Sequence, residues 1–163
     1  MTLYYFDSSA LVKIYVREPG SAWLRQLVAR EPLSPIIMVD LAVTEVAAAL
    51  SVLHRTNRIG RALWDRAFDQ FMTDINSRFD LARTELKDFF EAAELTRQYP
   101  LKAYDALQLT AALRRQRGLA TFATRLTFIS GDGTLLSAAQ AEGLTTDNPF
   151  DHVLPQDTPD RSP

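Results

Sequence analysis

Short apolar runs alternate with helical patterns along most of the chain. Apolar and aromatic residues fill positions 3–6, 36–39 and 126–129, and such short, fully apolar runs are typical of strands that are buried on both faces. Weaker strand patterns occur at 79–82 and 144–146. Strands of this kind that alternate with helices predict an α/β fold in which a small, mostly parallel sheet has helices on both faces.

Apolar residues at helical spacing fill most of the segments between these strands. The expected helices cover 8–17, 21–30, 41–54, a segment after the turn at 57–60, a segment from 84 through 95, 102–116, and a segment from the turn at 130–133 to 142. Asp40 is expected to cap the helix over 41–54, Thr84 to begin a helix, and Gly118 to end the helix over 102–116. Gly143 is expected to stop the last helix.

The chain is predicted to form one domain over residues 1–150, because 163 residues is an ordinary size for a single domain. From about residue 154 the proline-rich, polar sequence LPQDTPDRSP is typical of disorder, and residues 151–163 are assigned to a disordered tail. The opening sequence MTLYYFDSSALVK lacks the basic region of a signal peptide, and no apolar stretch approaches the roughly 18 residues of a membrane span. We therefore expect a cytoplasmic protein without a membrane partner.

The composition narrows the chemistry that the chain could carry out. It contains no cysteine, which excludes disulfides and thiolate metal sites, and its only histidines are His54 and His152, which disfavours zinc. The formal net charge of −2 provides no global positive field for nucleic acid. This charge counts against a passive nucleic-acid binder but less against a nuclease, because carboxylates that hold divalent cations lower the formal charge.

Two aspartates follow strands at the carboxyl edge of the predicted sheet, which is where ligands bind in parallel α/β sheets. Asp7 comes directly after the first strand, and Asp132 follows the run at 126–129 within three residues. Each has a local alternative, since Asp7 could cap the helix that begins at Ser8 and Asp132 lies in a Gly-Asp-Gly turn. Both are therefore candidates on position alone.

Glu45 and Asp105 are acids that the pattern places on inward-facing parts of helices. Glu45 is the only charged residue in LAVTEVAAAL, and an unpaired buried carboxylate costs about several kcal/mol. Its alternative is a salt bridge to a buried base, which the surrounding sequence does not supply. Asp105 lies between Leu101 and Leu109 near the start of a predicted helix, where an interaction with the helix dipole is its alternative.

Four acids gathered in one place would repel one another and raise their pKa values unless cations neutralise them. A hard divalent ion with oxygen ligands is the natural solution, so Mg²⁺, or Mn²⁺ in its place, is the expected cofactor. Such an ion can lower the pKa of a water for attack on phosphorus and stabilise the leaving oxygen. Ser130, two residues before Asp132, could orient a ligand or contact a phosphate, or it could be a simple turn serine.

The strings FDSSALVKIYVRE, TEVAAAL, YDALQLTAA and FISGD, in this order, resemble the motif set of PIN-domain ribonucleases, and above all the VapC toxins of type II toxin–antitoxin systems. The resemblance covers residues 1 to about 148. It implies a three-layer α/β/α sandwich, RNA cleavage that depends on Mg²⁺ or Mn²⁺, homodimers, and inhibition by a small antitoxin whose C-terminal segment covers the active site.

The resemblance also implies roles for individual residues. Asp7, Glu45 and Asp105 match the three core acids of the family, Asp132 matches the fourth, and Ser130 matches the hydroxyl residue of an S/T-x-D motif. The glycine that follows Asp132 is a departure, because relatives often carry a basic or bulkier residue there. The resemblance therefore does not say how Asp132 is held in place.

Arginines that cluster after the Glu45 helix are candidate RNA contacts. Arg55, Arg58 and Arg61 could follow an RNA backbone, although a solvated helix face is the simpler interpretation.

Several other functions stay open at this stage. A phosphatase of the haloacid-dehalogenase type also has an aspartate after its first strand, but it needs a second aspartate two residues on, where this chain has Ser9. A PIN-like nuclease could act on DNA, or in RNA processing outside a toxin system, although the short chain leaves little room for DNA-gripping elements. A non-catalytic binding module would not need all four acids.

Overall fold

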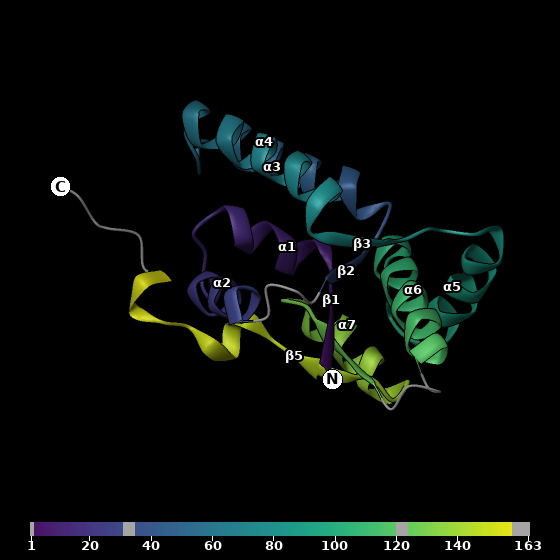
Figure 1. Ribbon diagram of the computed structural model, residues 1–163. Coiled ribbons are helices and arrows are strands. Elements are labelled where there is room, and N and C mark those ends of the chain that lie inside the picture. The colour runs from purple at the N-terminus through teal and green to yellow at the C-terminus, as the bar shows by residue number, and fades with distance from the viewer. Residues whose placement is uncertain (1, 31–34, 120–123, 158–163) are drawn as a thin grey trace.

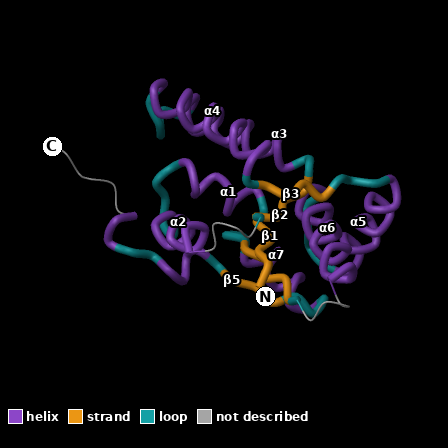
Figure 2. The backbone as a smooth tube through the Cα atoms, in the orientation of Figure 1, coloured by secondary structure: helices purple, strands orange, loops and turns teal. Residues whose placement is uncertain are grey.

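A parallel sheet runs through the middle of the molecule (Figure 2). The computed structural model describes residues 2–30, 35–119 and 124–157. In this part of the chain the sheet has five strands in the order β3-β2-β1-β4-β5, and every neighbouring pair is parallel. The strands are β1 (Thr2–Phe6), β2 (Ile36–Val39), β3 (Phe79–Ala82), β4 (Arg125–Ile129) and β5 (Thr145–Asp147).

Helices cover both faces of the sheet, so the predicted three-layer α/β fold is confirmed (Figure 1). The helices are α1 (Ser8–Tyr15), α2 (Ser21–Arg30), α3 (Ala42–Arg55), α4 (Arg61–Ser77), α5 (Leu86–Gln98), α6 (Ala103–Leu119) and α7 (Gly133–Ala141). On one face α1 packs against α2, α3 and α4, whereas on the other face α6 packs against α5 and α7. No helix in the described ranges has the length and apolarity needed to cross a membrane.

The three central strands are apolar because both of their faces are covered. Tyr5, Ile37 and Phe128 have no exposed surface, and the Tyr5 and Phe128 rings stack at 5.3 Å between centroids. Full burial on both faces explains why these strands are near-continuous apolar runs in the sequence rather than alternating patterns.

The strand order creates a switch point between β1 and β4. From β1 the chain continues to β2 on one side, whereas from β4 it continues to β5 on the other side. The backbone loops beyond two such strands diverge, and ligands of open α/β sheets bind in the crevice that this leaves. Asp7 directly follows β1 and Ser130 directly follows β4, so both lie at this crevice.

Three of the predicted helix boundaries differ from the structure. Asp40 does not cap α3, which has Leu41 at its N-cap position; instead the Asp40 carboxylate accepts hydrogen bonds from the Thr84 backbone and hydroxyl, which ties the loops after β2 and β3 together. For the same reason Thr84 does not begin α5, which starts at Leu86 behind a capping box made by Glu85 and Asp88. Gly118 lies inside α6, which extends to Leu119. Gly143 has a φ of +86° and ends α7 as predicted.

Residues 151–157, which the sequence assigns to a disordered tail, are ordered in the structure. Most of them lie in two 3₁₀ turns, Pro149–His152 and Pro155–Asp157. Asp157 is buried, and its carboxylate accepts hydrogen bonds from the backbone N–H groups of Gly20 (3.0 Å) and Ala22 (2.7 Å). The start of α2 needs acceptors for its N–H groups, and Asp157 supplies them. The assigned residues 158–163 lie outside the described part of the chain.

Candidate active site

All four predicted acids line one cleft of about 630 Å³. Asp7 comes from the end of β1, Glu45 and Asp105 come from the first turns of α3 and α6, and Asp132 comes from the loop after β4. Side chains from four separate segments therefore meet at the carboxyl edge of the sheet, where the strand order predicts a ligand site.

Asp7 is the most enclosed of these acids, with only 5% of its surface exposed. Its Oδ1 atom accepts hydrogen bonds from Ala10 N at 2.9 Å and Ser9 Oγ at 2.8 Å, and its Oδ2 atom accepts one from Ser130 Oγ at 2.7 Å. Burial and, to a smaller extent, the nearby charge of Asp105 raise the pKa of Asp7, against these hydrogen bonds, which lower it; the resulting pKa is about 6. Asp7 thus caps α1 and belongs to the cleft at the same time.

Replacing Asp7 by Asn is expected to stabilise the protein at neutral pH in the absence of metal. Burial raises the pKa of Asp7 from 3.8 to about 6, so its contribution to stability is fully present below about pH 4 and is lost as the pH rises through about 6. At about 1.4 kcal/mol per pKa unit, the ionised carboxylate lowers the free energy of unfolding by about 3 kcal/mol above that range. Asparagine resembles the neutral acid and avoids this loss.

Urea unfolding in EDTA, at about pH 4 and about pH 7.5, measures this effect for both proteins. Relative to the wild type, the free energy of unfolding of Asp7→Asn should rise by about 3 kcal/mol from the lower to the higher pH. A difference that does not change with pH would mean that Asp7 titrates normally.

Glu45 is half-buried and is held by neutral donors. Its Oε2 atom accepts hydrogen bonds from Ser8 Oγ at 2.6 Å and from Gln108 Nε2 at 2.8 Å. Gln108 also donates to Ser8 Oγ at 2.8 Å and accepts a hydrogen bond from the buried Tyr5 hydroxyl at 3.1 Å. Among the described residues no base forms an ion pair with Glu45, so the alternative of a structural salt bridge does not hold for this acid.

Gln108 is a site residue that the sequence did not reveal. It lies almost one helical turn after Asp105 in the apolar run LQLTAAL, and it is 2% exposed. A buried polar side chain on an apolar helix stripe is the signal that could have identified it, but its partners are 63 and 100 residues away in the sequence.

Replacing Gln108 by Ala is expected to lower catalytic activity by about 10- to 100-fold, because Glu45 would lose a donor that orients it. A purely structural role would change stability alone. The Kd for Mn²⁺, measured by calorimetry, is therefore the second readout, and it should rise in this variant. Gln140→Ala, which alters an exposed glutamine of α7, is the matched control. An unchanged Mn²⁺ affinity in Gln108→Ala would remove Gln108 from the site.

The charge of Asp132 acts on Asp105 across the cleft. Burial raises the pKa of Asp105, and the charge of Asp132 raises it further. Asp132 caps α7 through Oδ1, which accepts hydrogen bonds from Thr134 N at 2.8 Å and Leu135 N at 3.1 Å. Its Oδ2 atom has no hydrogen-bond partner among the described residues, so the capping role leaves one oxygen of Asp132 for a ligand.

Ser130 connects Asp7 to Asp132 rather than lining the cleft. Its side chain is fully buried, its hydroxyl donates to Asp7 Oδ2 at 2.7 Å, and its oxygen accepts a hydrogen bond from Asp132 N at 2.9 Å. Burial argues against the predicted direct contact with a phosphate. The side-chain contacts of Ser130 are with Asp7 and Asp132 themselves.

The donor set has the chemistry of a site for a hard divalent cation. The cleft supplies carboxylate oxygens from four segments, and burial and neighbouring acids raise the pKa values of Asp7 and Asp105. Within the described ranges no three acidic or histidine side chains are arranged to hold a metal ion. Hydrogen bonds from Ser8, Ser9, Ser130 and Gln108 engage oxygens of Asp7 and Glu45, so binding of a cation would require these carboxylates to turn.

Of the three predicted RNA-binding arginines, Arg58 lines the cleft, whereas Arg55 and Arg61 do not. Arg58 is exposed and lies 3.5 Å from Glu18, another cleft residue. Arg61 pairs with Asp65 at 2.9 Å and lies over the Trp64 ring, on α4. Arg55 is exposed at the end of α3. Two of the three arginines therefore lie outside the cleft.

Residues 4–130 match the sequence model of the PIN domain. In shape, the chain is similar to a chain in the crystal structure of VapBC2 from Rickettsia felis bound to a DNA fragment from their promoter, with a TM-score of 0.58 and 14% identity over 91% of this chain and 98% of that chain. It is also similar to PAE2754 from Pyrobaculum aerophilum, with a TM-score of 0.57 and 18% identity over 93% of this chain and 91% of that chain. At these identities the likeness shows the fold. No curated protein sequence matches the chain.

Proposed function

This chain belongs to the PIN domain family, and from that premise we propose that it is an endoribonuclease that hydrolyses RNA phosphodiester bonds with Mg²⁺ or Mn²⁺. The observation that carries the proposal is the meeting of Asp7, Glu45, Asp105 and Asp132 in one cleft at the switch point of the sheet. Carboxylates at such a site repel one another unless a cation is bound, and oxygen-only donor sets suit hard cations.

The roles of the residues follow from their contacts. Asp7, Glu45, Asp105 and Asp132 would hold the cation, which supplies a water of lowered pKa and stabilisation of the leaving oxygen. Ser130 orients Asp7 and Asp132, while Ser8 and Gln108 orient Glu45. Arg58, an exposed residue that lines the cleft, would contact a backbone phosphate. By analogy with the family, cleavage leaves a 5′-phosphate and a 3′-hydroxyl.

The proposal extends to a cytoplasmic toxin that a small antitoxin inhibits. The sequence resembles VapC toxins, and the VapBC2 structure from Rickettsia felis, which is bound to a promoter DNA fragment, has the same fold. Co-expression with the protein encoded by a short neighbouring gene should relieve growth arrest if this part of the proposal is correct. Arrest that persists with every neighbouring gene would point to an RNA-processing nuclease outside a toxin system.

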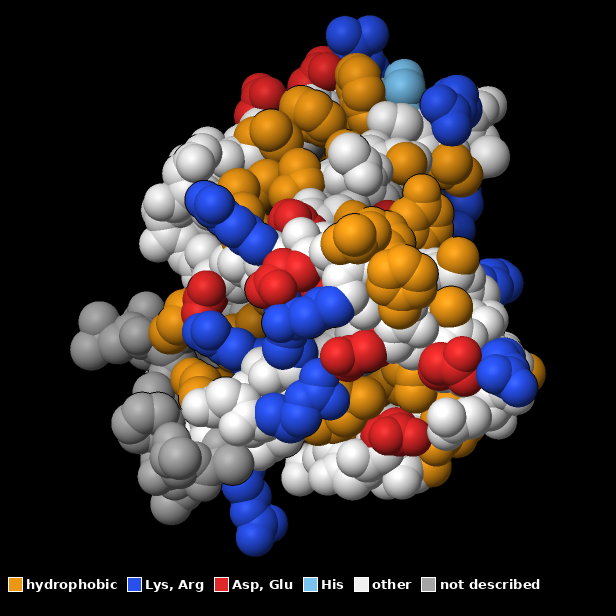
Figure 3. All heavy atoms as spheres, turned by 90° about the vertical axis from the view of Figure 1, so that its right-hand side faces the viewer, with side chains coloured by type: hydrophobic (Ala, Val, Ile, Leu, Met, Phe, Trp, Pro, Cys, Tyr) orange, Lys and Arg blue, Asp and Glu red, His pale blue; other side chains and the backbone are white. Residues whose placement is uncertain are grey.

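A homodimer is part of the same proposal. On the face that carries α5 and α6, apolar side chains gather among arginines and acids (Figure 3). The exposed members on these helices are Leu86, Phe89, Phe90 and Tyr104. Contiguous exposed apolar surface of this kind usually marks an interaction site, and a second copy of the chain is the occupant that the family resemblance favours.

Two competing functions make different demands on the cleft. A haloacid-dehalogenase phosphatase needs an acid at position 9, but the hydroxyl of Ser9 donates to Asp7 at 2.8 Å and has no acid–base capacity near neutral pH. A non-catalytic module would have no use for the raised pKa values of Asp7 and Asp105. Neither alternative accounts for the whole arrangement.

The test of the proposal is cleavage of single-stranded RNA and of DNA with the same sequence, each with Mg²⁺ and with EDTA. We expect RNA cleavage that requires the metal, with products that carry a 5′-phosphate. Cleavage of the DNA alone would replace the RNA assignment by a DNA nuclease. Mn²⁺ binding without cleavage of either the RNA or the DNA would support the alternative of a non-catalytic binding module.

A further inference from the structure

Phe150 is an exposed aromatic residue in the acidic cleft. It lines the cleft together with Asp7, Asp105 and Asp132, and 47% of its surface is open to solvent. Phenylalanine is among the residues that are most often buried, and this exposed ring lies inside the cleft, beside the acids.

Two neighbours hold the ring in place. Lys13 Nζ lies 4.2 Å from the ring centroid, within the cation–π range, so the ammonium group covers one face. Gly131 lies against the ring edge, because a Cβ atom at that position would come within 2.9 Å of Phe150 Cε2. Gly131 stands between Ser130 and Asp132, so the ring packs on the loop that carries Asp132.

The backbone that carries Phe150 is anchored on both sides of the ring. Before it, Asn148 Oδ1 accepts a hydrogen bond from Phe150 N at 3.0 Å, and Pro149 packs against Gly20, where a Cβ atom would meet Pro149 O at 2.2 Å. After it, His152 stacks on Trp23 at 4.0 Å. The buried carboxylate of Asp157 then ties the segment to the start of α2. The position of the ring relative to the acids is therefore determined by the fold.

We propose that Phe150 is a stacking site for a nucleobase of the substrate, adjacent to the phosphodiester that is cut. The proposal rests on the proposed RNA cleavage. Unpaired bases of single-stranded RNA are commonly held by stacking on aromatic side chains. Lys13 occupies one face of the ring, which leaves the opposite face for a base. One nucleotide could then present its phosphate to the acids and their cation and its base to Phe150.

A side chain of a protein partner is the competing occupant. A nucleotide is favoured because the ring packs on the loop that carries Asp132, so a ligand that engages both must carry an apolar plane next to a group that carboxylate-bound cations attract. A nucleoside phosphate has both features, whereas a peptide side chain supplies only the first.

The experiment compares intact RNA oligonucleotides with oligonucleotides that carry one abasic nucleotide on either side of the cleavage site. In the wild type one abasic position should raise KM by about 5- to 100-fold, as expected for the loss of one base–aromatic stack. In Phe150→Ala the intact RNA should show that same rise, and the abasic position should cause no further loss. Phe150→Trp should restore the wild-type KM, while kcat stays within about twofold throughout.

Controls separate stacking from packing. Val153→Ala truncates an exposed apolar side chain of the same segment outside the cleft and should leave KM unchanged. Full rescue by Phe150→Leu would show that an apolar contact suffices and would overturn the proposal. It would also be overturned if Phe150→Ala left RNA binding intact but released a bound antitoxin, because the ring would then serve a protein contact.

Failure of the proposed function remains distinguishable. Binding of the same oligonucleotides is also measured by fluorescence anisotropy in an Asp105→Asn background, where no cleavage is needed. Suppose that the wild type cuts no RNA, but Phe150→Ala weakens the binding of intact RNA and not that of abasic RNA. The stacking proposal is then supported, and the nuclease proposal fails. Equal affinity of both proteins for intact and abasic RNA would reject stacking whatever the activity.

Discussion

Replacing Asp7 by Asn is expected to reduce RNA cleavage by at least about 10³-fold while the protein remains folded. The change keeps the acceptor that caps α1 at Ala10 N, but it removes the negative charge at the most buried position of the cleft. Metal-dependent catalysis loses several orders of magnitude when a ligating carboxylate becomes neutral, since both the binding of the cation and the orientation of its water depend on that charge.

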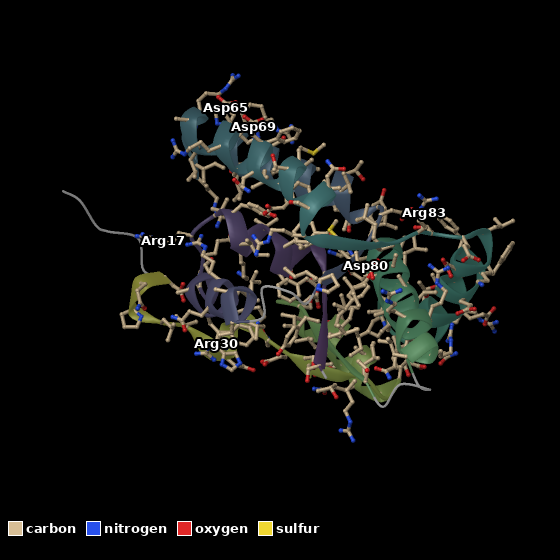
Figure 4. The ribbon with its side chains drawn as sticks, in the orientation of Figure 1. Arg17, Arg30, Asp65, Asp69, Asp80 and Arg83 are labelled. Carbon is tan, nitrogen blue, oxygen red and sulfur yellow. The ribbon has the colours of Figure 1, made fainter. Side chains whose placement is uncertain are left out.

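The matched control is Asp69→Asn. Asp69 is an exposed aspartate on α4, and Figure 4 shows it on the outer side of that helix, away from the sheet. This variant should cleave RNA at the wild-type rate. Urea unfolding of Asp7→Asn under the assay conditions checks that the variant is folded, as its expected stability without metal at neutral pH implies. Retention of more than about a tenth of the wild-type rate would remove Asp7 from the mechanism.

Chelation of divalent cations is expected to abolish cleavage completely, and Mg²⁺ or Mn²⁺ should restore it. The reason is that burial, together with the charge of neighbouring acids, raises the pKa values of Asp7 and Asp105, and a bound cation would stabilise their ionised forms. Binding should also stabilise the fold, by about 2.7 kcal/mol when the free metal concentration is 100 times the Kd. Thermal unfolding with and without Mn²⁺ measures this gain.

The stabilisation by metal should depend on pH in a defined direction. The pKa of Asp7 is about 6, so protons compete with the cation below that value. The gain in stability from a given Mn²⁺ concentration should therefore shrink as the pH falls from about 7.5 to about 5. Activity that survives EDTA, or a metal effect that does not change over this range, would contradict a carboxylate site of this kind.

The alternatives considered for single residues turned out not to exclude a role in the cleft. Asp7 caps α1 and Asp132 caps α7, as their local sequence allows, yet both line the cleft. In Asp132 one carboxylate oxygen accepts backbone N–H groups and the other is left for a ligand. Both oxygens of Asp7 accept hydrogen bonds, so its carboxylate would turn toward a ligand. Local signals of capping therefore carry little weight against a functional assignment for these acids.

Some helix ends were missed because contacts from other parts of the chain decided them. The Asp40 carboxylate accepts hydrogen bonds from Thr84 in the neighbouring loop. Asp40 therefore does not cap α3, and Thr84 does not begin α5, although the local sequence indicates both roles. Arg115 and Asp80 likewise pair between α6 and β3, where Figure 4 shows Asp80 beside that helix. Helix propensity depends only on the residues nearby in the sequence, and contacts with distant residues can override it.

By itself, the sequence determined the buried strands and the acids that follow them, because apolar runs and the residues at their ends are local features. Only the tertiary structure decided which side chains hold those acids and what completes the cleft. Gln108 reaches Glu45 across 63 residues, Asp157 reaches Gly20 across 137 residues, and Phe150 contacts Lys13 from the far end of the chain. Hydrogen bonds and ring contacts over such separations leave no periodic trace in the sequence, since they depend on where the packed elements finally lie.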